Sequence, residues 1–334
     1  MKRIGQKTLE FSAPPTVLSH AAVGGKKEAE GPLGADFDQT FQDTSLAMES
    51  WEKAEAQLQK EAVTLAIDKA GMSAAQMDFI FAGDLLNQCI SSTFGLLDFQ
   101  IPFLGQYGAC STMAQTLLMA AMTVESGAAE RSVAVTSSHF CSAERQFRTP
   151  LEYGSQRTPT AQWTATASGC VVVGKGGKVK IRHGLAGKIV DLGVKDPANM
   201  GAAMAPAAAD SIYQYLSDTG TKPDDYDGIF TGDLALVGTE LLYQSLEDNG
   251  VNIQNVHHDC GLLLYDRERQ DVHAGGSGCG CSASVLSGHL LKRMERGDLK
   301  NILFCATGAL MSPTSQQQGE AIPGICHILH LTTE

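Results

Sequence analysis

Gly105-Gln-Tyr-Gly-Ala-Cys-Ser-Thr-Met113 is the stretch on which the predicted fold is centred. It leads into a run that continues to Val124 and is apolar nearly all the way round, so as a helix it belongs in the protein interior. Gly127 follows as the residue that ends the helix. Cys110 and Ser111 should therefore lie at the N-terminus of a buried helix. Unpaired N–H groups and the helix dipole favour a thiolate or a bound carboxylate there. The alternative is a small buried cysteine in a helix-start loop.

The second half of the chain repeats the first. Residues 71–85 align without a gap on residues 220–234, and each copy follows a helical pattern and contains a strand that ends in Gly-Asp. Residues 278–305 likewise mirror the segment from Cys110 to the strand at 132–138. Repetition on this length scale indicates one duplicated α/β domain rather than a solenoid. We therefore expect two halves, residues 1–175 and 176–334.

Strands that alternate with helices predict mostly parallel, covered sheets. Ligands of such sheets gather at the carboxyl ends of the strands, where Asp84, Asn87, Cys110 and His139 should all lie. Other local patterns predict a breaker-rich loop at 100–104, a hairpin at 170–182, and a long polar loop at 140–166. A loop of that length usually covers a site.

Composition excludes several classes of protein. The net charge of -12 argues against a nucleic-acid surface, which needs clustered Lys and Arg. Nine cysteines without a Cys-x-x-Cys pair, and no apolar signal core, indicate a reducing, cytosolic compartment. No apolar stretch is long enough to span a membrane. We predict no metal site, because His257-His-Asp-Cys260 with Cys279-Gly-Cys281 lacks the spacing of a zinc site.

Gly-Ala-Cys-Ser at a buried helix start, in a duplicated α/β chain, resembles the thiolase superfamily and its β-ketoacyl synthase III-like condensing enzymes. That resemblance implies five layers, α-β-α-β-α, with the halves related by a pseudo-two-fold axis and with Cys110 in the place of the nucleophile. The catalytic His and Asn of those enzymes are absent here, from 231–233 and 277–281 respectively. Loss of one group that stabilises the transition state typically costs about 10²–10³ in rate. We therefore expect a fold kept for binding; an acyltransferase using Cys110 is the alternative, and a purely structural scaffold is a third.

Several longer motifs carry a closer resemblance over nearly the whole chain. The stretches 80–88, 107–113, 137–148 and 158–164 resemble the stage V sporulation protein AD family of spore-forming bacteria. The resemblance implies binding of dipicolinic acid (pyridine-2,6-dicarboxylate) and a part in its uptake, with Ca²⁺, into the developing spore. It implies no cofactor, except Ca²⁺ as the dipicolinate chelate. The implied partners are the other membrane proteins of the stage V sporulation A operon, and the place is the cytosolic face of the spore inner membrane, as a peripheral protein. By analogy with the superfamily, a homodimer could pair through the strand at 132–138.

A flat aromatic dianion needs charge-assisted donors and an apolar slot for its ring. The helix start at Cys110 could hold one carboxylate, and an arginine of the polar loop could clamp the other. For each arginine the alternative is a solvated loop charge or a structural salt bridge, for His139 a structural histidine, and for Asp84 a residue that orders its loop. The candidate ligand-binding residues are Asp84, Asn87, Cys110, Ser111, His139, Arg145, Arg148, Arg157, Trp163, Gly278 and Cys279.

Overall fold

Two five-stranded sheets form the frame of the protein in a computed structural model, which describes residues 1–147 and 157–334. The sheets touch edge to edge where β3 pairs briefly with β10. In order across the first sheet, the strands are β6 (Phe103–Gly105), β5 (Phe79–Gly83), β7 (Ser132–Ser138), β9 (Ala167–Gly174) and β3 (Thr16–Gly24). Those of the second are β12 (His257–Asp259), β11 (Gly228–Thr231), β14 (Asn301–Ala309), β15 (Gly324–Thr332) and β10 (Val179–Leu185).

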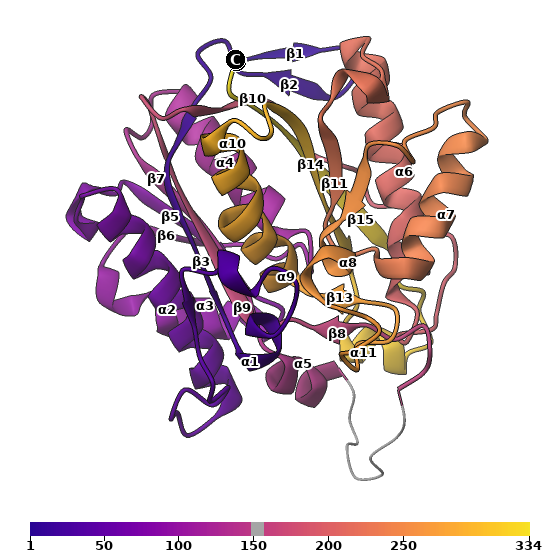
Figure 1. Cartoon of the computed structure of the whole chain (residues 1–334), viewed down its shortest axis with the longest axis horizontal. Coiled ribbons are helices and arrows are strands. Elements are labelled where there is room, and N and C mark those ends of the chain that lie inside the picture. The colour runs from indigo at the N-terminus through magenta and orange to yellow at the C-terminus, as the bar shows by residue number, and fades with distance from the viewer. Residues whose placement is uncertain (148–156) are drawn as a thin grey trace.

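Helices complete five layers (Figure 1). Between the sheets lie α4 (Thr112–Glu125) and a second helix made of α9 (Cys279–Ser284), the π-helical η6 (Val285–Leu290) and α10 (Leu291–Arg296). The outer face of the first sheet carries α2 (Trp51–Lys69) and α3 (Ile90–Gly95), and that of the second carries α6 (Met200–Thr219) and α7 (Ala235–Glu247). Because α4 contacts strands of both sheets, it belongs to the central layer. The thiolase-like α-β-α-β-α fold is confirmed.

Short elements complete the chain. They are β1 (Lys2–Ile4), β2 (Thr8–Glu10), β4 (Gln39–Thr40), β8 (Trp163–Thr164), β13 (Gly276–Ser277), α1 (Lys26–Ala29), α5 (Phe140–Phe147), α8 (Cys260–Leu264) and α11 (Pro313–Gln317), with the 3-10 turns η1 (Gly34–Asp36), η2 (Ala74–Gln76), η3 (Asn87–Cys89), η4 (Leu97–Phe99) and η5 (Pro223–Asp225).

The internal repeat corresponds to structure. The aligned segments 71–85 and 220–234 each contain a 3-10 turn followed by a parallel strand, β5 or β11, and each follows the long outer helix of its sheet. Asp84 and Asp233, which lie within two residues of the ends of these strands, are both buried. The chain passes from the first sheet to the second between β9 and β10, and the division at residue 175 stays a prediction.

Four local expectations were wrong. The strands β9 and β10 are not a hairpin, because β3 lies between them and pairs with both. The stretch 100–104 contains the start of β6, and α5 occupies the beginning of the segment expected to be a loop. Strand β7 pairs with β5 on one side and β9 on the other, so it is interior. The free edge of this sheet is β6.

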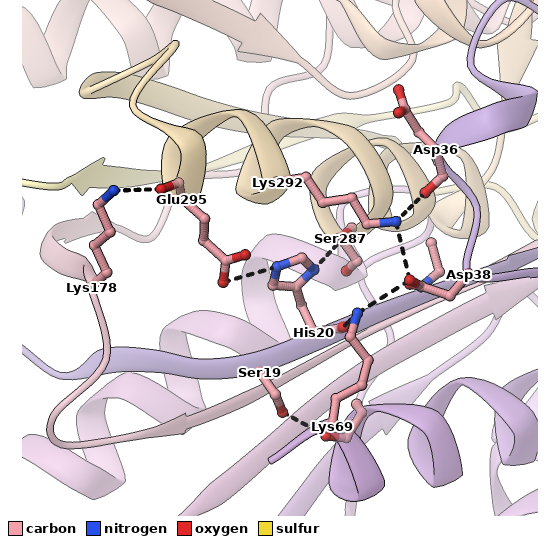
Figure 2. A network of polar contacts seen from close by, with 11 residues as sticks. Ser19, His20, Asp36, Asp38, Lys69, Lys178, Ser287, Lys292 and Glu295 are labelled. Atoms are coloured by element: carbon pink, nitrogen blue, oxygen red, sulfur yellow. Dashed lines mark hydrogen bonds and ion pairs between the residues drawn. The ribbon is translucent and has the colours of Figure 1, made fainter.

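A polar network fastens the outer helix α2 to the central helix (Figure 2). The Lys69 ammonium donates to the His20 carbonyl at 2.6 Å and to the Asp38 carboxylate at 3.2 Å. The same Asp38 carboxylate lies 3.0 Å from Lys292 on α10, and the His20 ring lies 3.2 Å from Glu295. Since His20 belongs to the edge strand β3, the network connects the outer helix α2, the first sheet and the central helix α10.

Candidate functional site

Cys110 lies in the short loop that joins β6 to α4. Ala109 has a left-handed backbone, with φ 50°. This conformation costs free energy in a residue with a side chain, and such strain is often found at functional sites. Ser111 Oγ donates to the Gly108 carbonyl at 2.6 Å, and the Gly108 N–H donates to Thr112 Oγ1 at 3.0 Å. These bonds close the loop on itself and hold Cys110 directly before the buried helix, as expected.

The buried side chain of Asp233 lies close to the Cys110 thiol, with Ser277 hydrogen-bonded to both. Cys110 Sγ lies 3.8 Å from Ser277 Oγ, which donates to Asp233 Oδ2 at 3.1 Å. Asp233 also accepts bonds from the Gly278 N–H and the Thr307 hydroxyl, both at 2.9 Å. Burial, reinforced by Asp233, raises the pKa of Cys110 well above its usual value. Of the two anions expected at this helix start, the thiolate is therefore disfavoured.

A cavity of about 260 Å³ opens beside Cys110. This is close to the lower end, about 300 Å³, of small-molecule sites, and apolar walls with a few polar groups are typical of them. Residues from both halves of the chain line it: Leu85, Tyr107, Ala109, Cys110, Ala143, Glu144, Phe147, Arg157, Thr158, Ala161, Gln162, Thr164, Pro197, Ala198, Met200, Ser277, Ala309 and Met311.

Arg157 is the arginine in this lining. Its side chain is only 10% exposed, and its Nη2 atom lies 2.6 Å from Asp271 Oδ2. Its Nη1 atom is buried without a hydrogen-bond partner among the residues that the structure describes. Trp163 lies against this guanidinium, with the ring centroid 4.7 Å from Arg157 Cζ, and is not itself part of the wall. A guanidinium N–H without a partner is a ready donor for an anion in the cavity.

Two residues expected at the strand exits hold loops instead. Asp84 accepts hydrogen bonds from the backbone N–H groups of Leu86 and Ser92, at 2.9 and 2.8 Å. The ring of His139 contacts the Thr44 carbonyl at 2.8 Å. Both side chains are almost fully buried, and neither lines the cavity. Backbone groups of nearby loops take up the hydrogen bonds of both side chains. The alternation of strands in the sequence does not reveal these bonds.

Asn87 and Arg145 lie at a different depression, between α2, α3 and α5. Arg145 forms an ion pair there with Glu52 of α2, and its side chain is 55% exposed. Arg145 therefore lies on one face of α5 at this second depression, while Ala143 and Phe147 of the same helix line the cavity beside Cys110. Arg148 lies outside the described residues.

The remaining predicted residues, Ser111, Gly278 and Cys279, lie next to the cavity but outside its lining. Ser111 is fully buried and bonded within its own loop. Gly278 offers its N–H to Asp233, and Cys279 donates its thiol hydrogen to the Ser137 carbonyl at 2.9 Å. None of these three residues lines the cavity, although Cys279 packs in one apolar cluster with Cys110.

Sequence reasoning missed several polar groups of the wall, among them Ser277 and Gln162. Gln162 donates from Nε2 to the carbonyls of Asp233 and Gly276, at 2.7 and 2.8 Å, which fixes the orientation of its amide. Its Oε1 atom has no partner within the described part of the chain. Gln162 precedes Trp163 within the stretch 158–164, one of the motifs that carry the resemblance, and this position was the available signal.

Within residues 1–147 and 157–334, no group of three or more His, Cys, Asp or Glu residues could hold a metal ion. His257 instead lies between the hydroxyls of Thr231 and Tyr243, at 2.9 Å from each. None of the described helices is both long and apolar enough to cross a membrane.

Solved structures of condensing enzymes share this fold. Cerulenin-bound OleA of Xanthomonas campestris superposes with a TM-score of 0.63 at 13% identity, covering 97% of this chain and all (100%) of that chain. The 3-oxoacyl-[acyl-carrier-protein] synthase III of Aquifex aeolicus VF5 gives 0.58 at 13% identity, covering 95% and 99%. At such low identity the likeness shows the fold alone.

Sequence comparisons show the family. The chain is 45% identical over 328 residues to stage V sporulation protein AD of Bacillus subtilis (strain 168), which covers 98% of this chain and 97% of that protein. The family model for stage V sporulation protein AD matches residues 5–332. The chain therefore belongs to the stage V sporulation protein AD family.

Proposed function

We propose that this sporulation protein binds dipicolinic acid, without catalysis, in the cavity beside Cys110. The observation that carries the proposal is the pairing of a small, mostly apolar cavity with the buried guanidinium of Arg157, in a chain of net charge -12. A flat aromatic ring suits the walls formed by Leu85, Phe147 and Met311. An anionic ligand in a net negative field needs a local cation, which Arg157 supplies.

The two carboxylates would meet different groups. One would accept from the unpartnered Nη1 of Arg157. The other would lie toward Cys110, whose protonated thiol is a neutral donor; the neighbouring Ser277 hydroxyl gives its hydrogen to Asp233. Asp233 accepts the hydrogen bond of Ser277 at this end, and among the described residues the cation that lines the cavity is Arg157. The Arg157 end should therefore carry most of the electrostatic stabilisation.

A non-catalytic role follows from the same geometry. A condensing enzyme needs a nucleophilic thiolate with donors that stabilise the developing charge. Here burial and the nearby Asp233 raise the pKa of Cys110 and favour the neutral thiol, and they outweigh the hydrogen bond from Ser277, which acts in the opposite direction. The alternative, an acyltransferase that uses Cys110, predicts a covalent acyl-enzyme. Incubation with an acyl-CoA followed by mass spectrometry of the Cys110 peptide would detect it, and its turnover would overturn the binding proposal.

The cellular role is proposed from the family. Binding would serve dipicolinate uptake, with Ca²⁺, into the developing spore, alongside the membrane proteins of the stage V sporulation A operon. The protein would then lie peripherally at the cytosolic face of the spore inner membrane. Its thiolase-like fold gives it a ligand cavity, and the operon partners would provide the membrane passage.

The deciding experiment is isothermal titration of the purified protein with dipicolinate, with and without Ca²⁺. Loss of a charge-assisted contact costs about 1.5–3 kcal/mol, so Arg157→Ala should weaken binding by about tenfold or more. Arg145→Ala removes the same charge from the neighbouring depression and is the matched control, expected to bind like the parent. Pyridine-2-carboxylate, which lacks one carboxylate, should bind the parent more weakly. Absence of saturable binding to the parent, in both arms, refutes the proposal.

A further inference from the structure

A second cation stands beside Arg157. Lys27 of α1 places its Nζ atom 3.8 Å from the centroid of the Trp163 ring, and the Arg157 Cζ atom lies 4.7 Å from the same centroid. Lys27 is half-buried and does not belong to the cavity lining. Nothing in the sequence near Lys27 links it to the site, because Arg157 is remote along the chain.

Both cations share one face of the indole. Phe140 stacks on Trp163 with centroids 3.6 Å apart and an angle of 6° between the rings, which leaves no room for a cation on that side. Lys27 and Arg157 must therefore both lie over the opposite face. Both also donate to the carbonyl oxygen of Asp271, Lys27 Nζ at 3.3 Å and Arg157 Nη2 at 3.0 Å. Two positive groups thus meet at a single oxygen atom.

Negative charge near the pair is scarce. The Asp271 carboxylate contacts Arg157 at 2.6 Å, and it is shared with His273 at 3.0 Å. Glu28, next to Lys27, is fully buried and receives bonds from the Tyr265 hydroxyl and the Thr166 N–H. Burial raises the pKa of Glu28, which favours its neutral form.

Another nearby acid is Glu30, which is exposed and pairs with Lys26. The Asp271 carboxylate contacts Arg157 directly, whereas Lys27 donates to the backbone carbonyl of Asp271. Like charges held this closely repel each other, and the repulsion is relieved when an anion lies between them. Such a local excess of positive charge stands out in a chain whose net charge is -12.

We propose that Lys27 and Arg157 together form a two-cation subsite that holds one carboxylate of the ligand at the Arg157 end of the cavity. The ligand's identity rests on the proposed function; the subsite itself rests on the geometry of the two cations. Arg157 makes the direct contact from the cavity wall. Lys27, which reaches the same Asp271 oxygen, adds a second charge within a few ångströms of that carboxylate and selects for anionic ligands.

The test replaces Lys27 by methionine, which keeps an apolar stem over Trp163 but removes the charge. Lys27→Met should weaken dipicolinate binding at least about fivefold, and Lys27→Arg should retain it. Lys26→Met is the matched control: it loses the same charge from the adjacent residue, which pairs with Glu30, and should bind like the parent. Because both cations serve one carboxylate, the effects of Lys27→Met and Arg157→Ala should be non-additive in the double variant.

Inorganic phosphate separates this proposal from the proposed function. Phosphate should raise the melting temperature of the parent and of Lys26→Met, and the rise should be smaller in Lys27→Met. If the parent binds dipicolinate and Lys27→Met binds it equally well, the subsite is wrong while the proposed function stands. If the parent does not bind dipicolinate, the proposed function falls, and the phosphate shift then decides the subsite alone: a shift unchanged in Lys27→Met overturns it.

Discussion

Substitution of His257 by glutamine should make the folded protein less sensitive to mild acid. His257 lies on β12 with 7% of its surface exposed, between the hydroxyls of Thr231 and Tyr243. Burial, with a smaller contribution from the neighbouring His258, lowers its pKa from 6.5 to about 3. Between these two values the unfolded chain binds a proton that the folded chain does not. The free energy of unfolding therefore falls as the pH drops through this window.

The size of the effect follows from the two pKa values. At about pH 7 His257 is neutral in both states and contributes almost nothing to the pH dependence. At about pH 5 the unfolded histidine is nearly all protonated and the folded one is not, which costs about 2 kcal/mol of stability. Glutamine does not titrate, so the His257→Gln variant should be spared this loss. Other buried groups also titrate, but their contributions cancel when the two proteins are compared.

Urea unfolding at about pH 7 and about pH 5 measures the difference. The parent should lose about 2 kcal/mol more than His257→Gln between the two pH values, whatever the variant's stability at neutral pH. His258→Gln is the control on the same strand; its side chain is exposed, so its substitution should recover a much smaller part. Equal losses in the parent and His257→Gln would refute the idea that His257 stays neutral in the folded protein.

Two further outcomes follow from the structure. Because burial and Asp233 keep the Cys110 thiol protonated, iodoacetamide near neutral pH should label the partly exposed Cys141 before Cys110, as read by peptide mass mapping; preferential labelling of Cys110 contradicts this. A homodimer remains a proposal from the fold family, now placed at the free edge β6, where Phe103 and Leu104 are 40% and 45% exposed. Leu104→Lys should then give a monomer in sedimentation experiments, and a dimer that survives the substitution rules out pairing through this edge.

Local sequence determined the α/β class of the fold and its duplication, whereas the five layers were implied by the resemblance to the thiolase superfamily. The apolar run after Cys110 could only be a buried helix, and the repeat of 71–85 at 220–234 required two similar halves. Both features depend on residues close together in the chain, whose spacing sets helix or strand. The same logic placed Cys110 at a helix start, because the turn and the helix that define its position are its immediate neighbours.

Only the tertiary structure decided which side chains meet. Arg145 and Arg157 look alike in the sequence, yet one pairs with Glu52 on a separate depression and the other lines the cavity with an N–H left over. Asp233 stands behind Cys110, and Lys27 beside Arg157, because the two halves and the α1 segment pack against each other there. The physical reason is that burial, charge and hydrogen bonding depend on distances in space, and residues far apart in the chain acquire those distances only when the two sheets close around the central helices.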